Sequence, residues 1–279
     1  MCGVNLDPLV EIWQRATGTQ PAPSWPVVLA TLLVAVAVVA WHRFWTVARH
    51  AVTLVHEAGH ATAAVLTGRR LAGIRLHSDT SGLTTSVGRP RGPGMVLTAA
   101  AGYLAPGLVG LGAAAMTSRG LSVGVLWCLL ALVAAIGVGI RNLFGLWSVL
   151  VSGTVLLALT WWAPVGWQTA AAYAVTWFLL LAAPRTVLEL ARTRRRGPRT
   201  SDADVLAQLT HVPAPVWVAV FALATAGTAV LGGLLLTQDG TSAEAPRTAW
   251  HAPGPGVTWA TGLDRLAAVC LPSHGRIDA

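Results

Sequence analysis

The sequence predicts an all-α membrane protein: a bundle of about six or seven transmembrane helices, with a small β-hairpin between the second and third spans. Hydrophobic residues make up 54% of the 279 positions and charged residues only 11%, whereas soluble domains average about 25% charged residues. Several apolar runs approach the roughly 20 residues that a helix needs to cross a bilayer. The basic residues, all arginine, gather in short clusters between these runs, as in the cytoplasmic loops of membrane proteins.

Seven segments are candidate spans, and the first of them is short for a full crossing. They are Trp25–Trp41, Trp45–Thr67, Met95–Met116, Leu121–Ile140, Asn142–Trp162, Val165–Ala183 and Pro215–Thr237. Residues 1–24 then form an N-terminal segment and residues 25–237 the transmembrane domain. Residues 238–279 are rich in Pro, Gly, Ser and Thr, and we expect a poorly ordered tail there.

The arginine clusters predict the topology. One cluster lies between the second and third spans and the other between the sixth and seventh: Arg69, Arg70, Arg75, Arg89 and Arg91, then Arg185, Arg192, Arg194, Arg195, Arg196 and Arg199. With seven spans both clusters fall on one side, which the positive-inside rule assigns to the cytoplasm. His42, Arg43 and Arg119 would then face outward. The net charge of +8 therefore reflects membrane topology, and we expect the lipid bilayer as a partner and no nucleic acid.

The segment between the second and third spans differs from its surroundings. Leu71–His77 shows partial alternation of apolar and polar residues, Ser78–Gly82 has turn-forming residues, and Leu83–Val87 is a second short run. This pattern predicts a β-hairpin over Leu71–Val87.

A metal-binding motif lies inside the second span. His56-Glu57-Ala58-Gly59-His60 matches HExxH, and on a helix the two histidines lie on one face, one turn apart. Both imidazoles can then bind one Zn²⁺ ion, with Glu57 as the base that activates water for peptide hydrolysis. The alternative is a polar helix face that hydrogen-bonds to neighbouring spans. Burying three ionisable residues at membrane depth favours the metal, because they need a shared partner.

A catalytic zinc needs a third protein ligand, and few carboxylates qualify. Asp79 has the position of a turn residue, and Glu189 is spaced to form an ion pair with Arg192. Asp202 and Asp204 remain. Ser201 and Asp204 resemble a capping box that opens a short helix over Asp202–Thr210, and capping alone would explain both acids. Asp202 is the preferred ligand, and the alternatives are that neither acid binds the metal or that Asp204 does. Asn142 and His211 are weaker candidates, and His77 belongs to the hairpin.

These residues together resemble the site-2 protease family of intramembrane zinc metallopeptidases, particularly its shorter bacterial branch. The resemblance covers about residues 49–217. It includes HEAGH within a span, the hairpin segment ending Ser81-Gly82-Leu83-Thr84, the Gly-rich span with Ala101-Gly102-Tyr103-Leu104-Ala105-Pro106, and the downstream Ser201-Asp202-Ala203-Asp204. It implies a multi-pass enzyme of the bacterial plasma membrane that cleaves a membrane-spanning protein substrate. It also implies zinc bound by His56, His60 and a distant Asp, with Glu57 as the general base.

The chain departs from the family pattern at its third motif. Typical members carry Asn-x-x-Pro-x-x-x-Asp-Gly, whereas here Asn142 has no Asp soon after it and Asp202 is followed by Ala. This departure supports a second hypothesis, a catalytically inactive pseudo-protease that acts as a membrane binding or regulatory protein. A transporter is a third hypothesis, but it would need more charged residues within the spans than the chain has.

Overall fold

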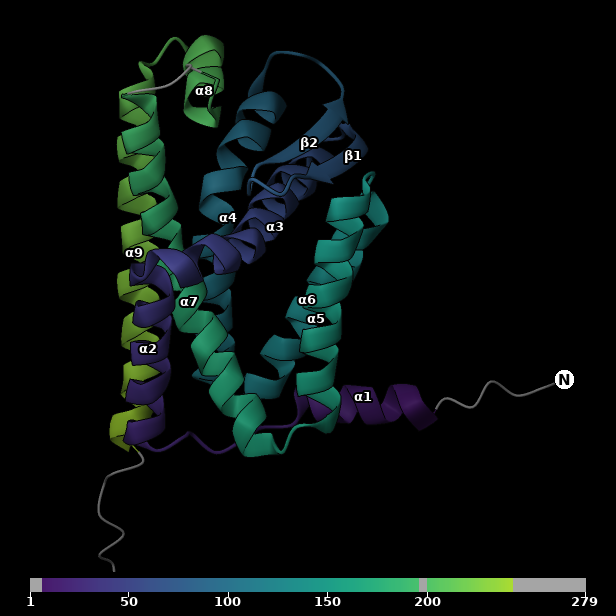
Figure 1. Ribbon diagram of the computed structural model, residues 1–279, viewed down its shortest axis with the longest axis vertical. Coiled ribbons are helices and arrows are strands. Elements are labelled where there is room, and N and C mark those ends of the chain that lie inside the picture. The colour runs from purple at the N-terminus through teal and green to yellow at the C-terminus, as the bar shows by residue number, and fades with distance from the viewer. Residues whose placement is uncertain (1–6, 196–199, 243–279) are drawn as a thin grey trace, which may run out of the picture. The chain divides into compact units, whose positions relative to one another are not determined.

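The computed structural model describes residues 7–195 and 200–242, and within these ranges the chain forms nine helices and one two-stranded antiparallel sheet. The predicted all-α membrane fold with a small hairpin is confirmed (Figure 1). In chain order the elements are α1 (Asp7–Thr17), α2 (Trp25–Ala40), α3 (His42–Leu66), β1 (Arg70–Leu76), β2 (Gly82–Val87), α4 (Pro93–Thr117), α5 (Ser122–Gly139), α6 (Leu143–Trp162), α7 (Val165–Arg194), α8 (Asp202–Thr210) and α9 (Ala214–Ser242). The tail predicted after residue 237 falls mostly on residues 243–279, outside the described ranges.

Five of these helices are long and apolar enough to cross a membrane alone, namely α4, α5, α6, α7 and α9. The helices α2 and α3 satisfy the same criterion only as a pair, and they meet at an angle of 98°. The expectation of two separate spans at Trp25–Trp41 and Trp45–Thr67 was therefore wrong. The physical reason is the composition of α3. It carries two arginines, the two histidines and one glutamate of its motif, and other polar residues, and these lower its hydropathy. By length and composition, the described residues contain five candidate spans, or six if the bent pair counts as one broken span.

The bend between α2 and α3 is held by α7. A helix that ends inside the bundle leaves carbonyl groups without intrahelical partners. The guanidinium of Arg185 donates a hydrogen bond to the carbonyl of Val39 in the last turn of α2. The same guanidinium lies 4.5 Å from the ring centroid of Trp45, in the first turn of α3. One α7 side chain thus contacts both sides of the break.

This bend corrects the predicted position of His42 and Arg43. Two residues before Arg185, the Cβ of Ala183 lies beside Gly107, near the middle of α4. His42 and Arg43 come three and four residues after Val39, at the bend itself, so they lie level with the middle of the bundle and not at its outer end. The N-terminal segment reaches the opposite end from the hairpin, because the Gln20 amide donates to the Gly120 carbonyl in the α4–α5 turn at 2.7 Å. The helix α1 in this segment was not predicted.

The four helices α4 to α7 lie between the first arginine cluster and the end of the second. Arg185, expected in the loop after the sixth span, instead lies on α7 and contacts the α2–α3 bend. An even number of crossings returns the chain to the end from which it started. The hairpin and α8 accordingly lie at the same end of the bundle (Figure 1). The α2–α3 bend removes one predicted crossing, but it comes before both clusters in the chain. The number of crossings between the clusters therefore stays even, as predicted.

The hairpin forms where the alternating pattern predicted it, and it folds back along α3. Its register pairs Leu76 with Gly82 next to the turn and Arg70 with Val87 at the open end. Ile74 and Leu76 of β1 pack against Leu54 and other apolar residues of α3 in one buried cluster. At the turn, the Thr53 hydroxyl donates to the Thr80 carbonyl at 2.9 Å. These contacts fix the turn and the adjoining part of β1 against the helix that carries the HExxH motif.

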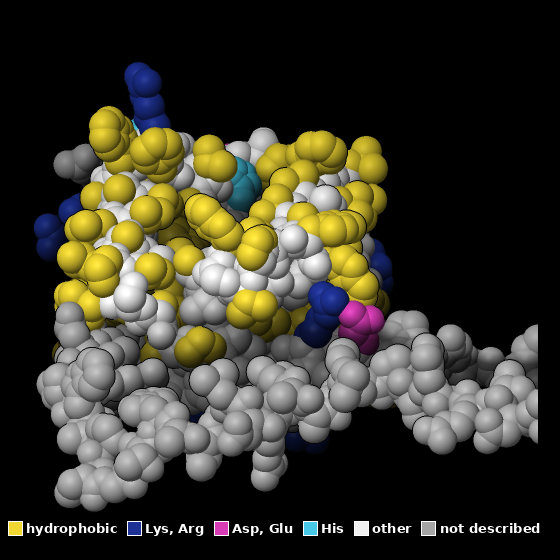
Figure 2. Space-filling view, turned by 90° about the horizontal axis from the view of Figure 1, so that it is seen from below, with side chains coloured by type: hydrophobic (Ala, Val, Ile, Leu, Met, Phe, Trp, Pro, Cys, Tyr) yellow, Lys and Arg dark blue, Asp and Glu magenta, His cyan; other side chains and the backbone are white. Residues whose placement is uncertain are grey.

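Apolar side chains cover much of the surface, as expected for a protein whose solvent is lipid. Leu223 on α9 and Trp147 on α6 are 76% and 65% exposed. Seen from below, the described atoms are mainly hydrophobic, and the few charged side chains lie towards the margins (Figure 2).

The tightest helix contact, between α3 and α4, depends on Gly59. A Cβ atom at this position would stand 2.5 Å from the Cβ of Ala105 and 2.7 Å from the carbonyl oxygen of Ala101. We expect Gly59→Ala to separate the two helices and to lower the free energy of unfolding by about 1–3 kcal/mol, as overpacking does. Denaturant unfolding in detergent measures this. Gly112→Ala is the matched control, because its Cβ meets nothing within 4 Å, and a control that is equally destabilised would contradict the packing argument.

Candidate metal centre

The two histidines of the motif converge on one point. Both project from α3, and the interplanar angle of their rings is 84°. Their Nε2 atoms are 3.0 Å apart. His60 is buried and His56 is half-buried, so the pair lies inside the bundle and is reachable from one side.

Asp202, the first residue of α8, reaches the same point. Its Oδ2 atom lies 3.3 Å from His56 Nε2 and 3.3 Å from His60 Nε2. Within residues 7–195 and 200–242, these three form the only group of three or more His, Cys, Asp or Glu residues whose ligand atoms all lie within 4.8 Å of one another. Burial alone would raise the pKa of the Asp202 carboxyl, but its close contacts with the two imidazoles hold that pKa below its ordinary value.

The local structure of α8 explains why Asp202 and not Asp204 meets the histidines. The Ser201 amide and hydroxyl both donate to Asp204 Oδ2, at 3.1 and 2.6 Å, so the predicted capping interaction forms. Arg194 of α7 pairs with the other oxygen of Asp204 at 2.6 Å. Although burial opposes it, these hydrogen bonds and the nearby guanidinium lower the pKa of Asp204. Asp204 is thus committed to the helix start, and Asp202, two residues earlier, points towards the histidines.

A second layer of contacts orients His60. Its Nδ1 atom lies 2.7 Å from the backbone carbonyl oxygen of Thr98 on α4. A carbonyl only accepts, so Nδ1 carries the proton and Nε2 keeps its lone pair for a metal. Such an outer partner is the usual accompaniment of a metal-binding histidine.

The backbone of α4 passes directly beside the pair at Gly102. A Cβ atom there would stand 2.6 Å from His56 Nε2 and closer still to His60 Nε2. Any side chain would therefore occupy the space beside both nitrogen atoms. Glycine at this position keeps that space open for an ion.

Glu57 is held by the hairpin. The Thr84 hydroxyl of β2 donates to Glu57 Oε2 at 2.6 Å. A Cβ atom at Gly82, also on β2, would overlap the Glu57 carboxylate. Glu57 is only 3% exposed, so its carboxylate is confined between α3 and β2, one residue from His56.

The other sequence candidates lie elsewhere. The Asn142 side chain exchanges two hydrogen bonds with the backbone of Leu76, at 3.1 and 2.6 Å. His211 ends α8 in a left-handed conformation, with φ of 60°. Asp79 accepts from the Ser81 amide and hydroxyl in the hairpin turn, as its turn assignment predicted. The amide of His77 donates to the Ser81 carbonyl in the same turn.

The predicted partner of Glu189 was wrong. Instead of Arg192, Glu189 lies 3.5 Å from Arg185, four residues earlier on α7, and 3.6 Å from Arg49 on α3. The Trp45 indole also donates to it at 2.6 Å. The reason is that these groups face the interior between α7 and α3, so tertiary packing selected the partner.

Three supporting residues were missed from the sequence. Thr98 acts through its backbone carbonyl, which carries no sequence signal. Gly102 lies in the Gly-rich span that contributed to the family resemblance, but nothing in the pattern placed it against the histidines. Thr84 was assigned to the hairpin, without a link to Glu57.

The donor set fits a zinc ion. Zinc binds imidazole nitrogen and carboxylate oxygen at about 2.0–2.2 Å in tetrahedral geometry, which places neighbouring ligand atoms about 3.3 Å apart. The three separations here are 3.0, 3.3 and 3.3 Å. Two histidines and one carboxylate also leave a fourth position open, as catalytic zinc sites do. Together with the space kept by Gly102, this arrangement could hold Zn²⁺.

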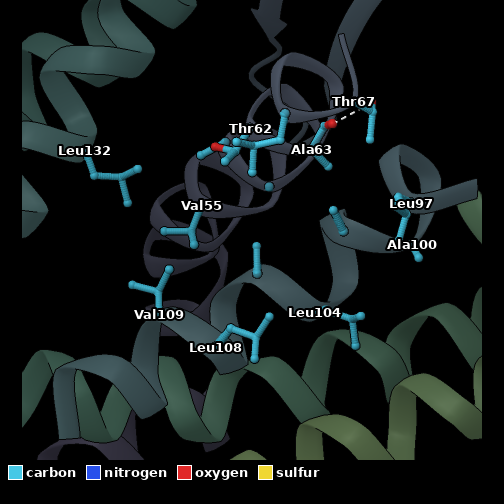
Figure 3. A pocket seen from close by; sticks show the side chains of 15 residues that line it. Val55, Thr62, Ala63, Thr67, Leu97, Ala100, Leu104, Leu108, Val109 and Leu132 are labelled. Carbon is cyan, nitrogen blue, oxygen red and sulfur yellow. Dashed lines mark hydrogen bonds between the residues drawn. The ribbon is translucent and has the colours of Figure 1, made fainter. Parts of the chain in front are cut away.

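An apolar cavity of about 430 Å³ lies beside this centre but is distinct from it. Residues of α3 and α4 line it, among them Val55, Thr62, Ala63 and Leu104, with Leu132 of α5 on its far side (Figure 3). None of its lining side chains is ionisable. The face of α3 that carries the histidines therefore differs from the face that borders the cavity.

One of three comparisons with known proteins found a match. The family model described as peptidase M50B-like matches residues 29–232, which include α3, the hairpin and α8. No curated protein and no solved structure matches the chain.

Asp202 and Asp204 provide a matched pair for testing the metal centre. We expect the purified protein to bind about one zinc ion per chain, and Asp202→Asn to weaken that binding by more than the roughly 10–100-fold typical of outer-layer substitutions. Asp204→Asn should leave zinc affinity nearly unchanged and lower thermal stability, because it removes a helix cap and an ion pair. Metal analysis and competition with a zinc chelator measure both. Equal zinc affinity in the two variants would exclude Asp202 as the third ligand.

Proposed function

Because the chain belongs to the peptidase M50B-like family, a family of site-2 proteases, we propose that it is an intramembrane zinc metalloprotease. In this proposal it hydrolyses a peptide bond in or near a transmembrane segment of another membrane protein. The metal ligands are His56, His60 and Asp202, and the general base is Glu57.

One observation carries the proposal: a carboxylate base and three metal-type ligands meet inside an apolar bundle. Ionisable groups at membrane depth are unfavourable unless they are partnered, and they mark functional sites. No cation among the described residues forms an ion pair with Glu57, which accepts a hydrogen bond from Thr84 at 2.6 Å. A buried carboxylate oriented by a hydroxyl beside a metal-type cluster is what a general base requires.

The metal ligands and Glu57 have different roles in the proposed reaction. A zinc ion held by the three ligands would supply Lewis acidity, which acidifies water and polarises a peptide carbonyl. Glu57 takes a proton from the attacking water while the water oxygen bonds to the carbonyl carbon, and the carbonyl π electrons move to its oxygen. Glu57 then delivers that proton to the amide nitrogen as the carbon–nitrogen bond breaks. The products are a carboxyl group and an amine, and Glu57 regains its starting charge.

The hairpin offers a place for the substrate backbone. The outer edge of β1 is already closed, because the Arg141 amide donates to the Ile74 carbonyl at 2.9 Å and Asn142 bonds to Leu76. The outer edge of β2 has no strand partner within the described residues. β2 also contacts Glu57 through Thr84 and Gly82. A substrate segment that unwinds and pairs with β2 would therefore pass beside the base.

The arginine clusters support an orientation. Within the described residues, the first cluster and Arg192, Arg194 and Arg195 of the second lie at the hairpin end of the bundle, and arginine-rich loops stay in the cytoplasm. We place the protein in a bacterial plasma membrane, with the hairpin and α8 towards the cytoplasm. Cleavage would then occur at the cytoplasmic part of a substrate helix, since α8 supplies Asp202 from that end.

The pseudo-protease hypothesis arose from the missing third motif of the family. Asp202 approaches both histidines to 3.3 Å, so an acid occupies the role that the missing motif would fill. This geometry favours the active enzyme.

Replacement of the base tests the proposal. We expect Glu57→Gln to reduce cleavage by about 10²–10⁴-fold while zinc content stays the same, because glutamine keeps the size of the side chain but does not accept the proton. Cleavage is measured in nanodiscs with a library of single-span peptides that carry a fluorophore and a quencher. Glu11→Gln is the control, since Glu11 lies on α1 and pairs with Arg15. If the wild-type protein binds zinc but cleaves no peptide, or if Glu57→Gln cleaves at the wild-type rate, the proposal fails.

A further inference from the structure

Tyr103 is fixed beside the metal centre by aromatic contacts on two sides. It follows Gly102 on α4, and its ring stands at 88° to the His56 ring, with centroids 4.8 Å apart. Its other face stacks on Phe221 of α9, with centroids 5.3 Å apart. The ring is therefore positioned before any substrate binds, and only its hydroxyl is left to take part in a polar contact.

That hydroxyl has no hydrogen-bond partner among the residues that the structure describes. The side chain is half-buried, so a substrate could reach it. The charges of Asp202 and Glu57 both act on the hydroxyl across the site. The hydroxyl is not among the described buried polar atoms that lack a hydrogen-bond partner. It is therefore open to an acceptor group that arrives from outside the chain.

Peptide hydrolysis creates a need for such a donor. The carbonyl oxygen becomes negatively charged when its carbon turns tetrahedral, and a preoriented donor aimed at that oxygen lowers the barrier. Several other donors near the centre are engaged: Thr84 donates to Glu57, Asn142 donates to the Leu76 carbonyl, and Arg49 pairs with Glu189. The Tyr103 hydroxyl is a donor beside His56 that has no partner among the described residues.

We propose that the Tyr103 hydroxyl donates a hydrogen bond to the carbonyl oxygen of the scissile peptide as that oxygen becomes negatively charged. The inference rests on the proposed protease function. It makes Tyr103 a catalytic residue that stabilises the transition state, supplied by the span that also carries Gly102. The aromatic contacts with His56 and Phe221 hold it in place without occupying the hydroxyl.

Tyr103→Phe tests this directly, because phenylalanine keeps the ring and its packing and removes only the donor. We expect kcat to fall about 10–10³-fold, with KM and zinc content unchanged. Tyr173→Phe is the control, since Tyr173 is the other tyrosine of the chain and lies buried on α7, in a different core cluster. Cleavage by Tyr103→Phe at the wild-type kcat would overturn the inference while leaving the protease function standing.

A binding measurement decides the matter independently of turnover. A phosphinic peptide places a charged tetrahedral oxygen where the carbonyl oxygen would lie. Calorimetry with the zinc-loaded protein in nanodiscs should show about 10–100-fold weaker binding to Tyr103→Phe than to the wild type, the loss expected for a hydrogen bond to a charged group. Acetohydroxamate, a small zinc-binding probe without the tetrahedral oxygen, should bind both proteins equally. Equal phosphinate affinity of the two proteins, or no binding to either, would overturn the inference even if no substrate is cleaved.

Discussion

The mutual pairing of polar groups inside an apolar bundle is the constraint on which the rest of this structure depends. His56, His60 and Asp202 lie where an unpartnered charge would be strongly unfavourable. They are stable there only because their atoms meet within 3.0–3.3 Å and because the neighbouring backbone completes their contacts. Gly102 leaves the space, and the Thr98 carbonyl fixes the orientation of His60. The packing of α3 against α4 therefore serves the polar centre as well as the hydrophobic core.

Helix α7 connects the two halves of that centre. Near its middle, Arg185 contacts both sides of the α2–α3 bend and so sets the path of the helix that carries the histidines. At its end, Arg194 pairs with Asp204 and fixes the start of α8. Val187 and Leu190 of α7 also pack with apolar residues of α8 in one buried cluster. A single helix thereby positions ligands that lie more than 140 residues apart along the chain.

The two strands of the hairpin have different roles: β1 packs against the bundle, and β2 contacts Glu57. β1 is closed on its outer edge by Asn142 and packs its apolar residues onto α3. β2 contacts Glu57 and leaves its outer edge open. An open strand edge is a ready template for pairing with another chain, and here it borders the buried base. In the proposed mechanism Tyr103 adds a donor from α4, so the groups that would bind, attack and stabilise a peptide come from different elements that meet at one point.

The sequence by itself determined the parts of the site that depend on local geometry. The 3.6-residue period of a helix places His56 and His60 on one face and Glu57 beside them, the alternating pattern predicts the hairpin, and Ser201 marks the start of α8. Only the tertiary structure decided that Asp202 meets the histidines, that Asn142 does not, and that α2 and α3 are joined at a bend instead of forming two spans. These outcomes depend on how α7 and α8 pack against α3 and α4. Contacts between residues so distant in the chain are set by the summed packing of whole helices, which no local pattern encodes.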